Sequence, residues 1–129
     1  MANGVTTVTP TWGRGQNIRK IHCHWLCEDD NGEPFDAVTP PLGGWIERVT
    51  YKITGGVTTP PTDNVLHLVL TDEDGAVLNT GTELDNLPNT GTTHWIPAEP
   101  MFVMGALTIR VQNNAANSAQ FDVYVYVSK

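Results

Sequence analysis

Basic residues are scarce in this sequence, and long apolar runs are absent from it. Seven Lys and Arg stand against 14 Asp and Glu in 129 residues, which gives a net charge of −7. A nucleic-acid-binding protein usually neutralises phosphates with a basic surface, so this balance argues against a nucleic-acid partner. No run approaches the roughly 18 apolar residues that a membrane span needs. We therefore expect neither a nucleic acid nor a membrane as a partner.

Residues that carry nucleophilic catalysis are also scarce. The two serines, Ser118 and Ser128, lie in an expected loop and near the end of the sequence, away from any nucleophile elbow. Two cysteines do not make a disulfide framework. The first ten residues, MANGVTTVTP, lack the cationic and apolar regions of a secretory signal. We therefore predict that the protein is not an enzyme, and that it acts where it is made or leaves the cell within a larger particle.

The residues that are abundant favour strands. Twelve Gly and nine Pro interrupt the chain too often for long helices, whereas Thr, Val, Ile, Tyr and Trp suit a pleated surface. Apolar residues alternate in short segments at spacings of about 8–12 residues. This pattern predicts an all-β fold, a β-sandwich or jelly roll of about seven or eight antiparallel strands. We expect one β-sandwich domain at 17–129, preceded by an extended, Thr- and Gly-rich arm at 1–16.

The segment NIRKIHCHWLCE at 17–28 is the most suggestive for chemistry. On a strand, its odd-numbered residues from 21 to 27 share one face, and His22 and His24 project from the other, about 7 Å apart. Two such histidines could share a metal, but a zinc site would also need His67 or His94 nearby. We favour the structural interpretation, with buried cysteines on one face and surface histidines on the other. No metal and no cofactor are predicted.

The segment WIERVTYKIT at 45–54 is expected to be a strand. Counting by alternation places Trp45, Val49 and Tyr51 on one face, which Glu47 interrupts. We expect Trp45 to cap the core from the end of this strand.

A hairpin and a long loop are expected in the middle of the chain. NVLHLVL at 64–70 is the most apolar run, and TDEDG should turn it into AVLNT at 76–80 as its partner strand. Residues 80–100 carry little periodicity, and a loop of that length is usually functional or covered by a partner. The last two strands are expected at 101–112 and 120–128. In the final strand three valines face one way, and one aspartate and two tyrosines face the other.

Two tryptophans lie in segments that lack periodicity, Trp12 in the expected arm and Trp95 in the long loop. Contact with a partner and packing in the core are both open interpretations of such rings. With their neighbours they form the predicted set of partner-binding residues, which is Thr11, Trp12, Arg14, Trp95 and Ile96.

Two segments resemble small virion proteins of tailed phages. PTDNVLHLVLTDEDGAVLNTGTELDNLPNTG resembles a segment of that family in which a Pro-Thr-Asp-Asn lead enters a strand and a Thr-Asp-Glu-Asp-Gly turn follows. FVMGALTIRVQNNAANSAQFDVYVYVS is similar to the closing hairpin of the family, with an Asn-rich turn and Val-Tyr alternation. The resemblance covers about residues 45–129. The first 44 residues match no pattern of the family.

The resemblance implies a structural protein of the phage particle, most similar to the capsid decoration (cement) proteins. Such proteins commonly bind the outside of the head across junctions between major capsid subunits, often as trimers. The implied partners are therefore the major capsid protein and further copies of this chain in a homotrimer. The implied location is the capsid surface of the virion, after synthesis in the host cytoplasm.

Two other functions stay open at this stage. The first is a carbohydrate-binding module of a head or tail fibre, in which Trp12 or Trp95 stacks on sugar rings. The second is a neck or tail connector component with the same sandwich.

Overall fold

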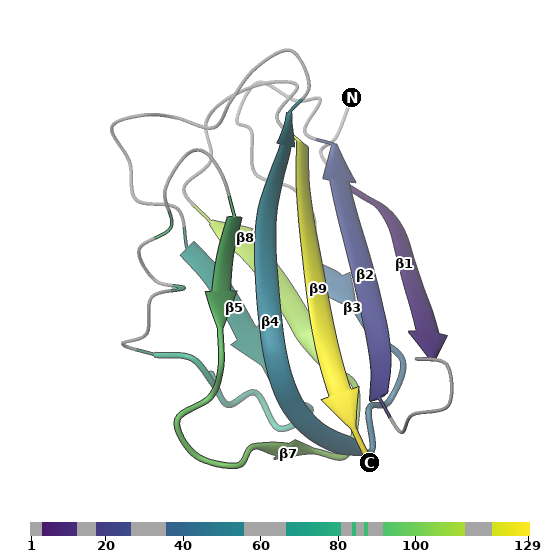
Figure 1. The fold of residues 1–129 in the computed structure, drawn as a ribbon, viewed down its shortest axis with the longest axis vertical. Helices are drawn as coiled ribbons and strands as arrows, with labels where there is room; N and C mark the ends of the chain where they lie inside the picture. Colours follow the sequence, from purple (N-terminus) through teal and green to yellow (C-terminus); the bar gives the residue numbers. More distant parts are fainter. Residues whose placement is uncertain are drawn as a thin grey trace.

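The protein consists of two antiparallel sheets that pack face to face (Figure 1). The computed structural model describes residues 4–12, 18–26, 36–55, 67–80, 84, 87, 92–112 and 120–129. No helix in these ranges is long and apolar enough to cross a membrane. The described strands are β1 (Gly4–Trp12), β2 (Ile18–Leu26), β3 (Ala37–Val38), β4 (Gly44–Gly55), β5 (His67–Thr71), β6 (Thr92–Trp95), β7 (Phe102–Val103), β8 (Thr108–Gln112) and β9 (Gln120–Ser128).

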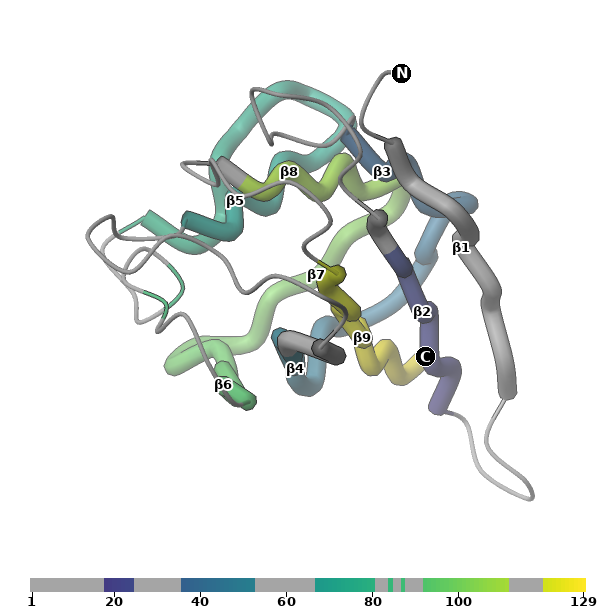
Figure 2. The backbone as a smooth tube through the Cα atoms, turned by 90° about the horizontal axis from the view of Figure 1, so that it is seen from above, coloured from purple at the N-terminus to yellow at the C-terminus, as the bar shows by residue number. Residues whose placement is uncertain are grey.

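Strand pairing divides these elements into a large and a small sheet. The large sheet has the order β1-β2-β9-β4-β6, and β7 also pairs with β4. The small sheet has the order β3-β8-β5. Seen from above, the small sheet forms one layer and β2, β9 and β4 form the other (Figure 2). The predicted all-β sandwich is confirmed.

The core lies between the two sheets and follows the period-two alternation of the strands. Ile21 and Cys23 of β2 are fully buried, and His22 and His24 lie on the outer face, as predicted. In β9 the three valines point inward and the two tyrosines outward, which also confirms the prediction. Leucines of the small sheet and its flanking segments fill the opposite side of this core, namely Leu68, Leu70, Leu84, Leu87 and Leu107.

A β-bulge changes the faces of β4 from those expected. The pairing of β4 with β9 shifts between Ile46 and Arg48, which makes Glu47 the extra residue of a bulge. Ile46 and Val49 are therefore both buried, although residues three apart lie on opposite faces of a regular strand. Trp45 is 41% exposed instead of capping the core. The prediction for Trp45 is wrong, because uninterrupted alternation takes no account of an extra residue.

Two segments divide differently from the prediction. The loop expected at 80–100 contains β6, which pairs with β4. The single strand expected at 101–112 is two short strands in different sheets, since β7 pairs with β4 and β8 pairs with β5 and β3. Residues 104–107 carry the chain from one layer to the other. The apolar residues of this segment serve both sheets, so a single alternation cannot describe them.

The hairpin expected at 64–70 and 76–80 has its turn but lacks a second strand. β5 pairs with β8, and the returning segment meets β5 through an isolated bridge between Thr71 and Val77. Beyond this bridge, the buried side chain of Asn79 takes the place of a strand. Its Oδ1 accepts a hydrogen bond from Leu70 N (2.9 Å), and its Nδ2 donates to Leu68 O (2.5 Å). The amide thereby covers backbone groups at the edge of the small sheet.

The segment expected to be an arm, residues 1–16, contributes a strand to the sheet. Gly4–Trp12 form β1, which pairs with β2 and lies at the edge of the large sheet. Its four threonines and two valines suit this pleated position. Arg14 lies outside the described residues.

We expect Asn79→Ala to lower the free energy of unfolding by about 2–4 kcal/mol, because two backbone groups lose their buried partner at about 1–3 kcal/mol each. Urea unfolding followed by circular dichroism measures this difference. Thr80→Ala changes the exposed neighbour and should stay within about 0.5 kcal/mol of the unmodified protein. Equal unfolding midpoints for the two variants would show that the amide is not a stabilising element.

We also expect the Cys23 thiol to be inert in the folded protein. Its side chain is fully buried, and the resulting desolvation raises its pKa to about 12. The thiolate fraction at pH 8 is then on the order of 10⁻⁴, against about a quarter for a free cysteine. In a Cys27→Ser variant, a disulfide reagent at pH 8 should modify Cys23 in guanidinium and leave it unmodified in native buffer. Rapid native labelling would contradict this burial.

Candidate partner-binding site

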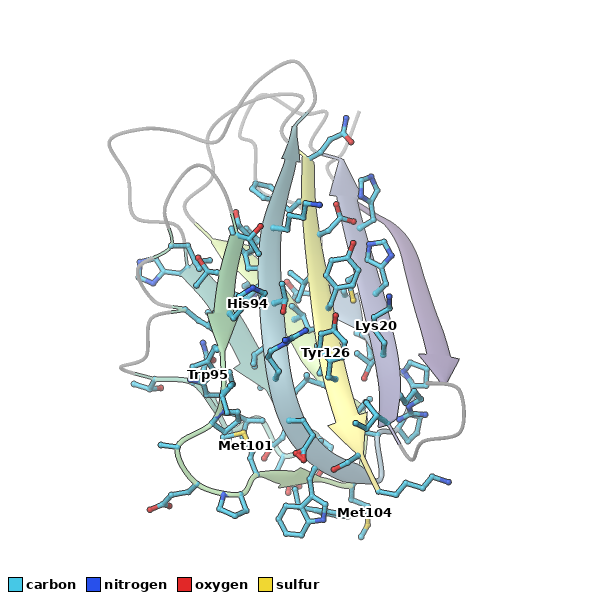
Figure 3. All side chains as sticks on the ribbon, viewed as in Figure 1. Lys20, His94, Trp95, Met101, Met104 and Tyr126 are labelled. Atoms are coloured by element: carbon cyan, nitrogen blue, oxygen red, sulfur yellow. The ribbon has the colours of Figure 1, made fainter. Side chains whose placement is uncertain are left out.

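β7 and the C-terminus lie at the same end of the sandwich (Figure 1). Large apolar side chains of β7 and the neighbouring residues are exposed. We call four of them the end patch. Met104 and Ile96 are 70% and 67% exposed, and Phe102 and Trp45 are 47% and 41% exposed. Figure 3 shows Met104 at this end of the molecule. Exposed apolar groups that gather in one place commonly mark a surface that binds another molecule.

The aromatic part of the end patch is built by the pairing of β4 with β7. Trp45 and Phe102 are direct cross-strand partners. Their ring centroids lie 5.1 Å apart with an angle of 70° between the planes, which is an edge-to-face contact. The bulge at Glu47 turns Trp45 outward, so that its ring meets Phe102 on the surface. Each ring thereby holds the other in place.

The backbone beneath Met104 is fixed by the neighbouring loop. Gly43 N donates to Met104 O (3.0 Å), and Leu42 N donates to Gly105 O (2.9 Å). Gly43 has a φ of 54°, a left-handed conformation that glycine adopts without strain. Gly105 N in turn donates to Glu73 Oε2 (2.6 Å). A patch held on such a backbone loses little conformational entropy when it binds.

A groove runs beside the end patch and has an acidic side. Its volume is about 340 Å³, and Trp45 and Ile96 line it together with Glu47 and Glu99. Both carboxylates are on exposed residues, and Ser128 Oγ donates a hydrogen bond to Glu47 (3.1 Å). The surface therefore combines an apolar centre with negative charge at one edge. This combination suits a partner that offers apolar groups flanked by cations.

The predicted partner-binding residues have different fates in the structure. Ile96 belongs to the end patch, and Trp95 is 4% exposed and packs in the core from β6. Trp95 cannot offer its ring to a partner, because a strand missing from the prediction turns it inward. Thr11 and Trp12 end β1, which finishes at the same end of the sandwich as the end patch (Figure 1). Their side chains and Arg14 lie outside the described part.

Alternation missed three members of the end patch, Trp45, Phe102 and Met104. The bulge hides Trp45 from a count made on the sequence. Phe102 and Met104 carried a usable signal, because the run MFVM at 101–104 is apolar on both faces of a strand. Where one face of such a run is buried, the other must expose apolar groups.

The Cys23 thiol is separated from the imidazoles that are its neighbours in the sequence. The Cys23 thiol faces the core, whereas His22 and His24 face outward, so that neither ring can activate the sulfur. His94 is engaged elsewhere, because its Nδ1 lies 2.8 Å from Oγ1 of the buried Thr50. This contact joins β6 to β4.

A larger hollow of about 780 Å³ lies against the small sheet and is lined by His67, Val77 and Arg110 among others. Arg110 binds both carboxylate oxygens of Asp36, at 2.9 and 2.8 Å. The guanidinium is thus already engaged by a carboxylate of its own chain. This hollow is therefore less suited to binding a ligand than the end patch is.

The end patch is therefore the described surface best suited to binding another molecule. Its rings are partly exposed, its backbone is fixed, and an acidic edge adds direction. No protein-family model matches the chain, and no curated protein is detectably similar to it in sequence.

Proposed function

We propose that this protein is a structural component of a phage particle, a capsid decoration protein that binds the outside of the head across major capsid subunit junctions and stabilises them. The observation that carries the proposal is the end patch, four large apolar side chains presented on a fixed backbone at one end of a sandwich. The resemblance of residues 45–129 to small tailed-phage virion proteins supports the choice of partner. A β-sandwich with an exposed apolar patch at one end is suited to binding across the junction between two larger subunits.

The size of the end patch argues for several copies acting together. Covering four half-exposed side chains gains about 1 kcal/mol each, or about 4 kcal/mol before the cost of association. Even without that cost, a gain of that size corresponds to no better than millimolar affinity for one copy. A homotrimer presents three end patches at once, so that the second and third contacts form at a high effective concentration. We therefore include the homotrimer in the proposal.

The acidic edge determines which orientation of the partner is favoured in the proposed contact. Glu47 and Glu99 lie beside the apolar centre and favour a capsid surface that presents Lys or Arg at the matching edge. Exposed charges of this kind change the association rate and its salt dependence more than they change the final affinity.

The test is attachment to purified heads of the phage that encodes the chain. We expect a Phe102→Ser, Met104→Ser double variant to lose at least about tenfold in occupancy, because it removes about 2 kcal/mol of apolar contact per copy. Quantitative gel analysis of sedimented heads measures the occupancy. Val77→Ser is the matched control, since Val77 is 49% exposed outside the end patch.

Circular dichroism melts should show that the double variant and the control are equally folded. Undiminished occupancy of the double variant would overturn the end patch as the anchor. An equal loss with Val77→Ser would point to a different face of the sandwich. The number of copies per particle distinguishes a decoration protein from a neck or tail connector.

A carbohydrate-binding module is the second candidate, and one observation favours it. The half-exposed ring of Trp45 stands beside the carboxylates of Glu47 and Glu99 in one groove. Sugar-binding sites combine a ring on which the sugar stacks with polar groups that bind its hydroxyls. Trp95 takes no part in this candidate, because it is buried.

Glycan-array binding by the unmodified protein, abolished by Trp45→Ala, is the outcome expected of this second candidate. Asp74→Asn changes an exposed carboxylate outside the groove and is the matched control. Absence of binding across the array would eliminate a sugar as the ligand of the groove.

A further inference from the structure

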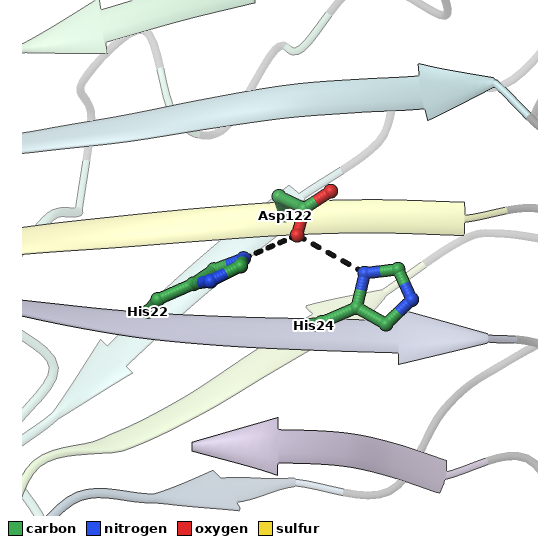
Figure 4. A group of neighbouring side chains, drawn as sticks. All are labelled: His22, His24 and Asp122. Atoms are coloured by element: carbon green, nitrogen blue, oxygen red, sulfur yellow. Dashed lines mark hydrogen bonds and ion pairs between the residues drawn. The ribbon is translucent and has the colours of Figure 1, made fainter. Parts of the chain in front are cut away.

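Three polar side chains meet on the outer face of the large sheet (Figure 4). His22 and His24 come from β2, and Asp122 comes from β9. Strand pairing places His24 directly opposite Asp122, and His22 lies two residues away on the same face of β2. Residues about 100 positions apart in the sequence are thus brought together by two neighbouring central strands.

The three side chains converge on a single oxygen atom. His24 Nδ1 lies 3.0 Å from Asp122 Oδ1, and His22 Nε2 contacts the same oxygen. One nitrogen of each ring and the carboxylate oxygen all lie within 4.8 Å of one another. The dashed lines of Figure 4 show both rings turned toward the carboxylate. This convergence is the geometry from which three ligands can surround one ion.

The three side chains of the cluster differ in their burial. The Asp122 side chain is 5% exposed, whereas those of His22 and His24 are 32% and 25% exposed. The carboxylate is therefore held beneath two rings that reach the solvent. An anion removed from water needs positive charge or hydrogen bonds around it. In the structure the two rings contact the carboxylate, and a divalent cation placed between the three ligand atoms would replace these contacts and keep one coordination position open to water.

We propose that His22, His24 and Asp122 bind a divalent transition-metal ion of the Zn²⁺ type. Two imidazole nitrogens and one carboxylate oxygen are the ligands that Zn²⁺ takes in sites with three protein ligands, at about 2.0–2.2 Å each. Tetrahedral bonds of that length separate neighbouring ligand atoms by roughly 3.4 Å, so that small rotations of the side chains suffice. Mg²⁺ and Ca²⁺ prefer sets made of oxygen ligands and suit this cluster poorly.

Some neighbouring side chains favour the binding of an ion and others disfavour it. The His22 ring stacks on Tyr124, with centroids 4.4 Å apart and 15° between the planes, and this contact orients the ring. Lys20 Nζ lies 5.3 Å from the centroid of the same tyrosine, and Lys52 is the cross-strand partner of Asp122 on β4. These two lysines repel a cation, but solvent weakens the repulsion, because Lys52 is exposed and Lys20 is partly exposed. The preformed ligand set decides in favour of binding.

A bound ion would join β2 to β9 through side chains as well as through the backbone. Because the unfolded chain separates the ligands by about 100 residues, the ion binds the folded protein far more strongly than the unfolded one. Folding and metal binding are then coupled, and saturating Zn²⁺ raises the temperature of unfolding. The site lies on the outer face of the large sheet and adds a ligand to the protein beyond the proposed contact with a capsid.

The test is titration of tag-free, chelator-treated full-length protein with ZnCl₂ in a calorimeter. We expect saturable binding of one Zn²⁺ per chain, and no saturable heat with MgCl₂ or CaCl₂. His22→Ala and His24→Ala should each weaken binding by more than the roughly 10–100-fold that follows the loss of an outer partner of a metal ligand. His94→Ala and His67→Ala, which remove the chain's other two histidines, should bind as the unmodified protein does.

A second measurement distinguishes a loss of metal binding from misfolding of the variants. Circular dichroism melts with and without Zn²⁺ should show a rise in the unfolding temperature for the unmodified protein and for His94→Ala. The rise should be absent for His22→Ala and His24→Ala, whose melts in chelator report whether they fold. The proposal is overturned if the unmodified protein shows no saturable Zn²⁺ binding. It is equally overturned if folded His22→Ala and His24→Ala bind Zn²⁺ as tightly as the unmodified protein.

Discussion

The pairing of β9 with a strand on each side is the constraint on which the rest of the structure depends. β9 is far from both β2 and β4 in the sequence, and it joins them into one continuous sheet. The inward side chains of β9 form much of the core, and its outward side chains give the large sheet its polar face. Both candidate sites follow from this arrangement. The histidine cluster uses the contact of β9 with β2, and the end patch uses the bulge opposite β9 in β4.

Alternation within single strands was enough to predict the fold class and most of the buried faces. It assigned Cys23 to the core and His22 to the surface, because each strand was regular over those residues. It failed wherever a residue was inserted or a short segment served two sheets. Glu47 is the first case, and the chain from β7 to β8 is the second.

The candidate sites were harder to predict than the fold, because each depends on contacts between distant segments. Ile96, predicted to bind a partner, lies on the surface, whereas Trp95, predicted with it, packs in the core from a strand that periodicity did not reveal. A zinc site at the histidine pair was expected to need His67 or His94 as a further ligand. Asp122 takes that place because β9 lies beside β2, a fact that neither segment's own pattern contains.

The bulge in β4 has a consequence for how the binding surface can change. Ile46 and Arg48 lie opposite Val127 and Tyr126, which are consecutive on β9, so deleting Glu47 would remove the bulge and leave Ile46 buried and Trp45 outside. If Glu47 were instead taken into the regular alternation of the strand, Trp45 would point toward the interior and Ile46 outward. The choice between a tryptophan surface and an isoleucine surface at this end thus depends on where β4 accommodates its extra residue, and it needs no change in composition.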